Sequence, residues 1–165
     1  MIVVLRSMDY EQLKEQISEN DKIVLWSCND CTKYSNLGGR KNLDALAKAL
    51  EKDGYNVIHQ EIIGVGCQPP LIRQRSRRPA TKEIFDEATA IVVLACTDGF
   101  LKTQRVFKNA KVIQVGESVG LGVYSKAEGM KLVIPLEETG LPPSIEGYTL
   151  EEAAKKLGKK SGPVV

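Results

Sequence analysis

Two segments of the chain are near-continuous runs of β-branched and aliphatic residues. These runs are residues 22–28 (KIVLWSC) and residues 89–96 (TAIVVLAC). They are typical of strands that are covered on both faces in a parallel sheet. Weaker patterns of the same kind predict two further strands, at residues 55–63 (YNVIHQEII) and 111–115 (KVIQV).

The segments between these strands have helical spacing. In residues 42–52 the apolar side chains share one face of a helix, and Gly54 is placed to end it. Further helices are predicted for residues 9–17, 80–88 and 100–107, and a capping box at Thr149 and Glu152 predicts one over 149–157. Alternating strands and helices predict an α/β fold, and we expect a Rossmann-like or flavodoxin-like three-layer sandwich with a mostly parallel sheet.

The remaining segments give weaker signals. Residues 1–6 are expected to form an edge strand or an arm, and residues 130–136 a short strand that Pro135 confines to an edge. The glycine-rich residues 116–122 are interpreted as a turn. Residues 1–157 are expected to form a single α/β metal-binding domain, followed by a frayed C-terminal tail, residues 158–165.

Composition narrows the classes of partner. The charged residues make up 27% of the chain and leave a net charge of only +2, and no aromatic residues interleave with basic ones, which argues against nucleic-acid binding. No apolar run approaches the roughly 20 residues that span a bilayer. Met1–Leu5 lacks the features of a signal peptide, so a cytoplasmic protein without membrane contact is expected.

The four cysteines form the most informative pattern. Cys28 ends the predicted strand at residues 22–28, and Cys31 follows three residues later. Cys67 follows the predicted strand at residues 55–63, and Cys96 ends the one at residues 89–96. The carboxyl ends of parallel strands meet at one edge of a sheet, where open α/β sheets bind ligands. In a reducing compartment four thiols at one edge predict a metal centre, and they match the ligand set of either a [4Fe-4S] iron–sulfur cluster or a Zn site.

Residues near the cysteines extend the predicted site. Glycines bring the backbone close to a bound group, so Gly38, Gly39, Gly64 and Gly66 are predicted to contribute to cofactor binding. Arg73 is also predicted to contribute. It belongs to a basic segment with Arg75, Arg77 and Arg78, which is predicted to be a loop beside Cys67. This loop is either a patch that binds an anion or a partner protein, or an ordinary solvated surface.

Other interpretations of the same residues stay open. Cys96 also suits a small core residue. Trp26–Cys31 (WSCNDC) is faintly similar to the thioredoxin motif, which would make the protein a cytosolic dithiol oxidoreductase using Cys28 and Cys31. A structural zinc-binding interaction module is a further alternative. His59, the only histidine, is interpreted as structural.

The order of these motifs resembles that of one known family. A cysteine cluster followed by Gly-Gly (CNDCTKYSNLGG), a lone cysteine before a basic segment (CQPPLIRQRSRR) and a strand ending in Ala-Cys (LACTDGFLKTQ) follow one another over about residues 1–140. In this the chain is similar to the N-terminal region of the small iron–sulfur partner subunit of acetogen-type methylenetetrahydrofolate reductase, a family also called the methylenetetrahydrofolate reductase C-terminal family.

The resemblance implies a role in electron transfer. It implies that the protein holds an iron–sulfur cluster and exchanges electrons with a flavoprotein partner subunit in one-carbon metabolism, as an accessory subunit rather than a stand-alone catalyst. Two differences limit it: Ser35 stands where a further cysteine is expected, and a short cysteine-free tail replaces the family's cysteine-rich half. The chain can therefore build at most one four-cysteine cluster, and whether it also forms a homo-oligomer stays open.

Overall fold

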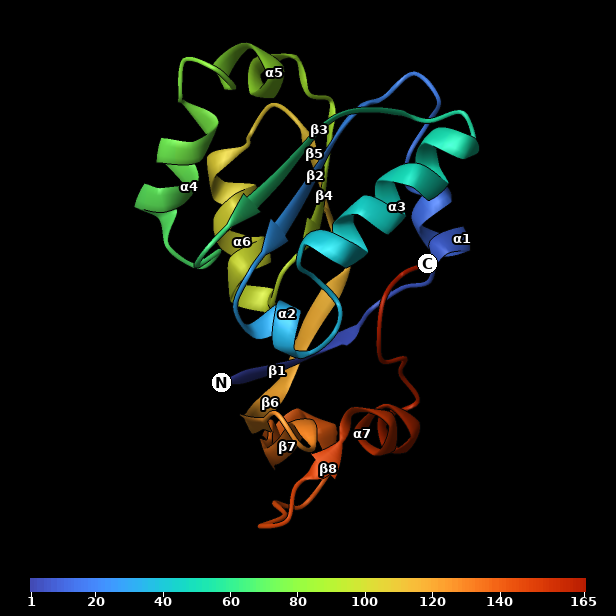
Figure 1. Cartoon of the computed structure of the whole chain (residues 1–165), viewed down its shortest axis with the longest axis vertical. Helices are drawn as coiled ribbons and strands as arrows, with labels where there is room; N and C mark the ends of the chain where they lie inside the picture. Colours follow the sequence, from blue (N-terminus) through green and yellow to red (C-terminus); the bar gives the residue numbers. More distant parts are fainter.

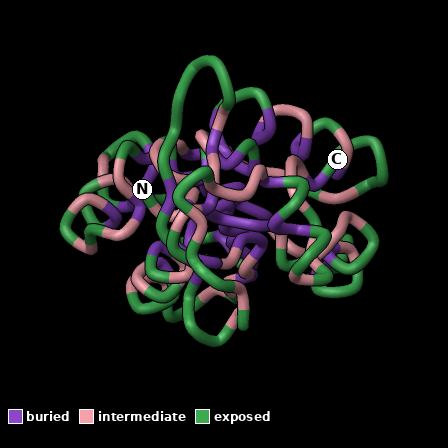
Figure 2. The backbone as a smooth tube through the Cα atoms, turned by 90° about the horizontal axis from the view of Figure 1, so that it is seen from below, coloured by how far each residue is buried: buried purple, intermediate pink, exposed green.

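The strands of the protein form two sheets. A computed structural model describes all 165 residues, and it places a parallel sheet and an antiparallel sheet end to end (Figure 1). The backbone through the middle of the molecule is mostly buried, while the exposed segments lie in the outer loops (Figure 2). The chain is thus a mixed α/β fold.

The parallel sheet contains all four strands that the sequence predicts most directly. It consists of β3 (Asn56–Ile63), β2 (Lys22–Cys28), β4 (Ala90–Leu94) and β5 (Lys111–Gln114), in this spatial order. All three strand pairs are parallel. After β2 the chain moves to β3 on one side and then returns to β4 on the other side, so the strand order reverses between β2 and β4.

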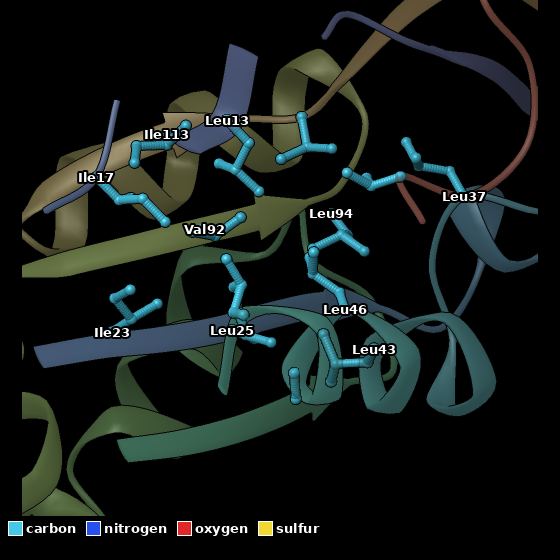
Figure 3. Close-up of a cluster of buried hydrophobic side chains, with 14 of the residues drawn as sticks. Leu13, Ile17, Ile23, Leu25, Leu37, Leu43, Leu46, Val92, Leu94 and Ile113 are labelled. Carbon is cyan, nitrogen blue, oxygen red and sulfur yellow. The ribbon is translucent and has the colours of Figure 1, made fainter. Parts of the chain in front are cut away.

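Helices cover both faces of the parallel sheet (Figure 1). On one face, α1 (Tyr10–Lys14) and α3 (Arg40–Lys52) pack on the apolar side chains of β2 and β4. Figure 3 shows this layer, in which Leu43 and Leu46 of α3 point toward Leu25 of β2. The predicted helical face of residues 42–52 is therefore confirmed.

The opposite face carries an aromatic cluster. It is covered by α4 (Pro69–Ser76), α5 (Lys82–Glu87) and α6 (Thr97–Val106). Trp26 of β2 is fully buried there, and the edges of Phe85 and Phe107 meet its ring, with centroids 5.8 and 5.6 Å away. This cluster joins the middle of β2 to the helices beyond it.

The antiparallel sheet was predicted only in part: the strands expected at residues 1–6 and 130–136 are present, and the first lies at an edge, but the strand between them was not predicted. Its strands are β1 (Ile2–Arg6), β6 (Gly116–Ser125), β7 (Gly129–Pro135) and β8 (Tyr148–Thr149), in this order. The prediction of a turn at residues 116–122 was wrong, because these residues belong to β6. The prediction that Pro135 confines its strand to an edge was also wrong, since β7 pairs with both β6 and β8, and Pro135 is its last residue.

This second sheet changes the fold class. The α/β prediction is confirmed, but the whole chain is not a clear Rossmann-like three-layer sandwich, because four of the eight strands lie in a separate antiparallel sheet. Helix α7 (Leu150–Leu157) covers that sheet and begins at the predicted capping box, in which Thr149 and Glu152 exchange hydrogen bonds. Two short helical segments, α2 (Cys31–Tyr34) and the 3₁₀ turn η1 (Glu137–Thr139), complete the structure.

The C-terminal tail lies against the first strand. Residues 158–165 were expected to fray, but Lys160 forms a β-bridge with Arg6, and Val164 is buried in the core of the parallel sheet. The Arg6 guanidinium donates to the Pro163 carbonyl oxygen at 2.5 Å. None of the helices has the length and apolar character needed to cross a membrane.

Candidate metal centre

The structure brings the four cysteines to the carboxyl edge of the parallel sheet. Cys28 is the last residue of β2, Cys31 begins α2, Cys67 lies between β3 and α4, and Cys96 directly precedes α6. The edge lies where the strand order reverses between β2 and β4, which is the position where open α/β sheets bind their ligands. The predicted placement of the cysteines at strand ends is therefore confirmed.

Contacts between loops tie the two buried thiols together. The Gly66 amide donates to the Cys28 Sγ at 3.3 Å, and a Cβ on Gly66 would lie 3.4 Å from that sulfur. A Cβ on Gly99 would lie 3.5 Å from the Gly66 carbonyl oxygen and 3.6 Å from the Cys96 Sγ. These distances are ordinary contacts, but a Cβ on Gly66 would also lie 3.1 Å from the Cys28 Cβ, and one on Gly99 would lie 2.9 Å from the Ala95 Cβ, so both positions favour glycine.

The charges of the other three cysteines act on the Cys96 thiol. Burial is the main cause that raises the pKa of the Cys96 thiol, and the charges of Cys28, Cys31 and Cys67 raise that pKa further. Burial likewise raises the pKa of Cys28 and of Cys67. Burial, and to a smaller extent this repulsion, favours the protonated form of Cys28, Cys67 and Cys96, and a bound metal would favour their thiolates. All four cysteines are free thiols.

Backbone amides also favour a charged sulfur at this edge. Besides the Gly66 amide, the Asp30 amide lowers the pKa of Cys28, and the Gly99 amide lowers that of Cys96, although burial outweighs both. Cys96 occupies the N-cap position of α6, a ten-residue helix whose N-terminus favours negative charge. Gly99 was missed by the sequence analysis, and its only signal is the Asp-Gly pair that follows the Ala-Cys motif.

The residue types at this edge fit a soft metal centre. Thiolates are the ligands of zinc and of iron–sulfur clusters, and amide donors to the sulfurs are a usual second layer of such sites. As the side chains stand, no group of three or more His, Cys, Asp or Glu residues is arranged to hold a metal ion.

The other predicted site residues are divided between the site and the scaffold. Gly66 contacts Cys28, and the Gly64 carbonyl oxygen accepts a hydrogen bond from the Cys28 thiol at 3.9 Å, although Gly64 itself is exposed. Gly38 packs on the hydroxyls of Ser27 and Thr32, and the Gly39 amide donates to the Ser27 hydroxyl at 2.9 Å. These two glycines therefore shape the turn behind the cysteines, and no thiol lies among their nearest atoms.

Ser35, which replaces an expected cysteine, has a role in the fold. Its side chain is almost fully buried, and its Oγ accepts a hydrogen bond from the Val4 amide at 3.1 Å. This contact connects the turn after the Cys28–Cys31 segment to β1 of the other sheet. The serine thus links the two sheets.

The first part of the basic segment lies on a helix, and two of its four arginines form ion pairs within the protein. Residues 69–76 form α4 rather than the predicted loop, and Arg73 is exposed on it. The Arg78 guanidinium donates to the buried Glu61 carboxylate at 2.7 Å, and Arg75 lies 3.5 Å from its other oxygen. An anion or partner patch on this segment therefore has fewer free arginines than the sequence suggested.

Removal of Glu61 is expected to loosen α4. His59 also contacts its carboxylate, at 3.3 Å, so one buried acid holds three groups. The side chains of the two arginines are about 40% exposed, so water can solvate them when the carboxylate is removed. We therefore expect Glu61→Ala to lower the free energy of unfolding by about 2 kcal/mol. Urea unfolding of the metal-free protein measures this.

The matched control for Glu61 is Glu83→Ala. Glu83 is exposed on α5 and makes no ion pair, so its removal is expected to change stability by less than about 0.5 kcal/mol. Equal effects of the two substitutions would show that the Glu61 ion pairs do not hold α4.

The thiol pKa values predict an alkaline loss of stability. In the metal-free folded protein the pKa values of Cys28, Cys67 and Cys96 lie above the ordinary value of 9.0, at which the unfolded chain ionises. Above that pH the folded state binds more protons than the unfolded state, so stability falls as the pH rises from about 8 to about 10. The urea midpoint of the metal-free protein should drop over this range, and less so when all four cysteines are serine. An equal drop in both would contradict the raised thiol pKa values.

Comparisons with known proteins add no relative. No protein-family model, curated protein or solved structure matches the chain. The resemblance in motif order therefore remains a hypothesis.

Proposed function

We propose that Cys28, Cys31, Cys67 and Cys96 hold one [4Fe-4S] cluster and that the protein is an electron-transfer or accessory subunit. The observation that supports this most is the gathering of all four thiols at the reversal of strand order, from three separate strand ends. The order of motifs, which resembles that of an iron–sulfur subunit, favours a cluster over zinc. When bound, the cluster would supply a one-electron carrier.

The chain's own residues would bind and shield that group. Cys28 and Cys96 are less than 10% exposed, whereas Cys67 and Cys31 are partly exposed. The Gly66, Asp30 and Gly99 amides would donate to the cysteine sulfurs and stabilise their negative charge. The more exposed thiols would face the electron partner.

The proposed partner is a flavoprotein of one-carbon metabolism, similar to methylenetetrahydrofolate reductase, in the cytoplasm. A partner is supported by exposed apolar side chains on the antiparallel sheet: Leu121 and Val123 of β6 are 47% and 59% exposed, and Ile134 of β7, which pairs with Leu121, is 51% exposed. Neighbouring apolar groups on a surface mark contact sites in many proteins. Catalysis would then lie mainly in the partner.

The alternatives predict other properties. A dithiol oxidoreductase requires a nucleophilic cysteine with a depressed thiol pKa, whereas burial raises the pKa of Cys28. A structural zinc module would use the same four thiols and remain colourless.

An anaerobic redox experiment tests the proposed function. The purified protein should be brown and lose visible absorption when dithionite is added; after the excess dithionite is removed, the reduced protein should pass its electron to added free flavin mononucleotide, which bleaches as it is reduced. Colourless protein, or a colour that dithionite does not change, would overturn the electron-transfer role.

A further inference from the structure

The largest cavity of the protein lies at the amino edge of the parallel sheet. It has a volume of about 680 Å³ and is lined by residues from the segments 76–77, 82–88 and 106–110. The last two segments lead into β4 and β5, so the cavity lies at the opposite end of these strands from the four cysteines (Figure 1). Cavities of this size commonly bind small molecules.

One wall of the cavity is aromatic. Phe85 of α5 and Phe107, which follows α6, both line it, and their rings are stacked with centroids 5.2 Å apart. Both rings also meet the fully buried Trp26, so the core of the sheet holds this wall in place. Phe107 is only partly buried. A planar aromatic ring of a ligand can therefore pack against it.

Cations outnumber acids around the same cavity. Arg77, Lys82 and Lys108 line it, against Asp86 alone. Lys82 forms an ion pair with Asp86, whereas Arg77 and Lys108 are exposed and form no ion pair. The whole chain has a net charge of only +2, so two uncompensated cations at one cavity equal the excess of the entire molecule. The cavity thus favours a ligand with about two negative charges.

Arg77 differs from its neighbours in the basic segment. Arg75 and Arg78 pair with the buried Glu61 carboxylate, whereas Arg77, at the C-cap position of α4, lines the cavity. A free guanidinium can donate two parallel hydrogen bonds to a phosphate, and a lysine ammonium adds a second positive charge. Arg77 and Lys108 together therefore suit a phosphate group.

We propose that this cavity binds a nucleoside monophosphate, with the base against Phe107 and the phosphate at Arg77 and Lys108. Such a ligand combines an aromatic ring with an anion of nearly two charges, and these are the two features that the lining selects. The Asn109 side chain, also at the cavity, can donate to and accept from the edge of a base. The proposal uses none of the four cysteines and holds whether or not they bind a metal.

Isothermal titration calorimetry on the full chain tests the proposal, with adenosine, guanosine, cytidine and uridine monophosphate as probes. We expect at least one of them to bind saturably at one site per chain, and at least about tenfold more tightly than its own nucleoside or inorganic phosphate. A second readout is the NMR signal of the indole N–H of Trp26, the single tryptophan. Because its ring meets Phe107, this signal should shift with the same midpoint as the calorimetric titration.

Single substitutions locate the binding site. Arg77→Gln and Lys108→Gln are each expected to weaken nucleotide binding about tenfold, since each removes one charged contact to the phosphate. Ala110→Leu places a larger side chain in the lining and leaves both cations, and it is expected to weaken binding at least as much. The matched control is Lys48→Gln, on α3 at the other face of the sheet. Its exposed ammonium forms no ion pair, and its loss should leave the affinity unchanged.

Three results would overturn the proposal. No saturable binding of any of the four nucleotides would show that the cavity does not take this class of ligand. Inorganic phosphate or a nucleoside that binds as tightly as the nucleotide would show that the aromatic wall or the cations are not used. Equal losses for Lys108→Gln and Lys48→Gln would mean that the charge of the whole molecule, and not this cavity, attracts the anion.

Discussion

Replacement of Cys96 by serine is expected to lower the iron content of the anaerobically purified protein by more than about tenfold, because loss of a ligand exceeds the 10- to 100-fold cost of losing a second-layer partner. Serine fills nearly the same space, so the buried N-cap position of α6 should remain occupied. The same loss is expected for Cys28→Ser, Cys31→Ser and Cys67→Ser, since each supplies one of the four ligands.

The control for these variants is the metal-free protein itself. The circular dichroism spectrum of metal-free Cys96→Ser should match that of the metal-free unsubstituted protein, because serine nearly fills the space of the buried cysteine. Full iron content in Cys96→Ser would show that this cysteine is a core residue, which the sequence left as an alternative.

The substitution Trp26→Ala is expected to lower the free energy of unfolding by about 3 to 5 kcal/mol, as for other fully buried large side chains. Trp26 is 0% exposed and is in edge contact with two phenylalanine rings, which would lose their main neighbour. Urea unfolding followed by circular dichroism measures this, because the chain has a single tryptophan and loses its fluorescence signal.

A phenylalanine at the same position provides the matched comparison. The indole nitrogen of Trp26 is buried without a hydrogen-bond partner, so Trp26→Phe removes an unsatisfied polar group while it keeps an aromatic ring. We therefore expect a loss well below that of Trp26→Ala. A loss for alanine as small as that for phenylalanine would mean that the aromatic cluster does not hold β2 to its helices.

The parallel sheet could be predicted from the sequence because its strands are buried on both faces. Residues 22–28 and 90–94 have almost no polar side chains. A strand that is buried on both faces needs such a continuous apolar run, so the run is a direct signal of the strand. The position of the thiols followed from the same argument, since strand ends meet at one edge.

Strand β6 of the antiparallel sheet could not be predicted because glycine erases its pattern. A Cβ on Gly120 would lie 2.3 Å from the Ile134 carbonyl oxygen, and one on Gly122 would lie 2.1 Å from that of Lys131. These close approaches exclude side chains, so the alternation of polar and apolar positions that marks a strand is missing from β6.

Helix α4 was missed for a different reason. Pro69 and Pro70 look like loop residues but occupy the first turn of the helix, where proline is tolerated. Only Ile72 and Ser76 of this helix are buried, and of the two arginines paired with Glu61 only Arg75 lies on it, since Arg78 follows its end. A short helix with so few buried apolar side chains shows no helical spacing of apolar residues in the sequence.

The measurement that tests the central claim most directly is the content of iron, acid-labile sulfide and zinc per chain in protein purified without oxygen. If the four thiols hold one cubane cluster, the protein contains about four iron and about four sulfide ions per chain and almost no zinc. About one zinc per chain without iron or sulfide would contradict the account and leave a structural zinc site at the edge of the sheet.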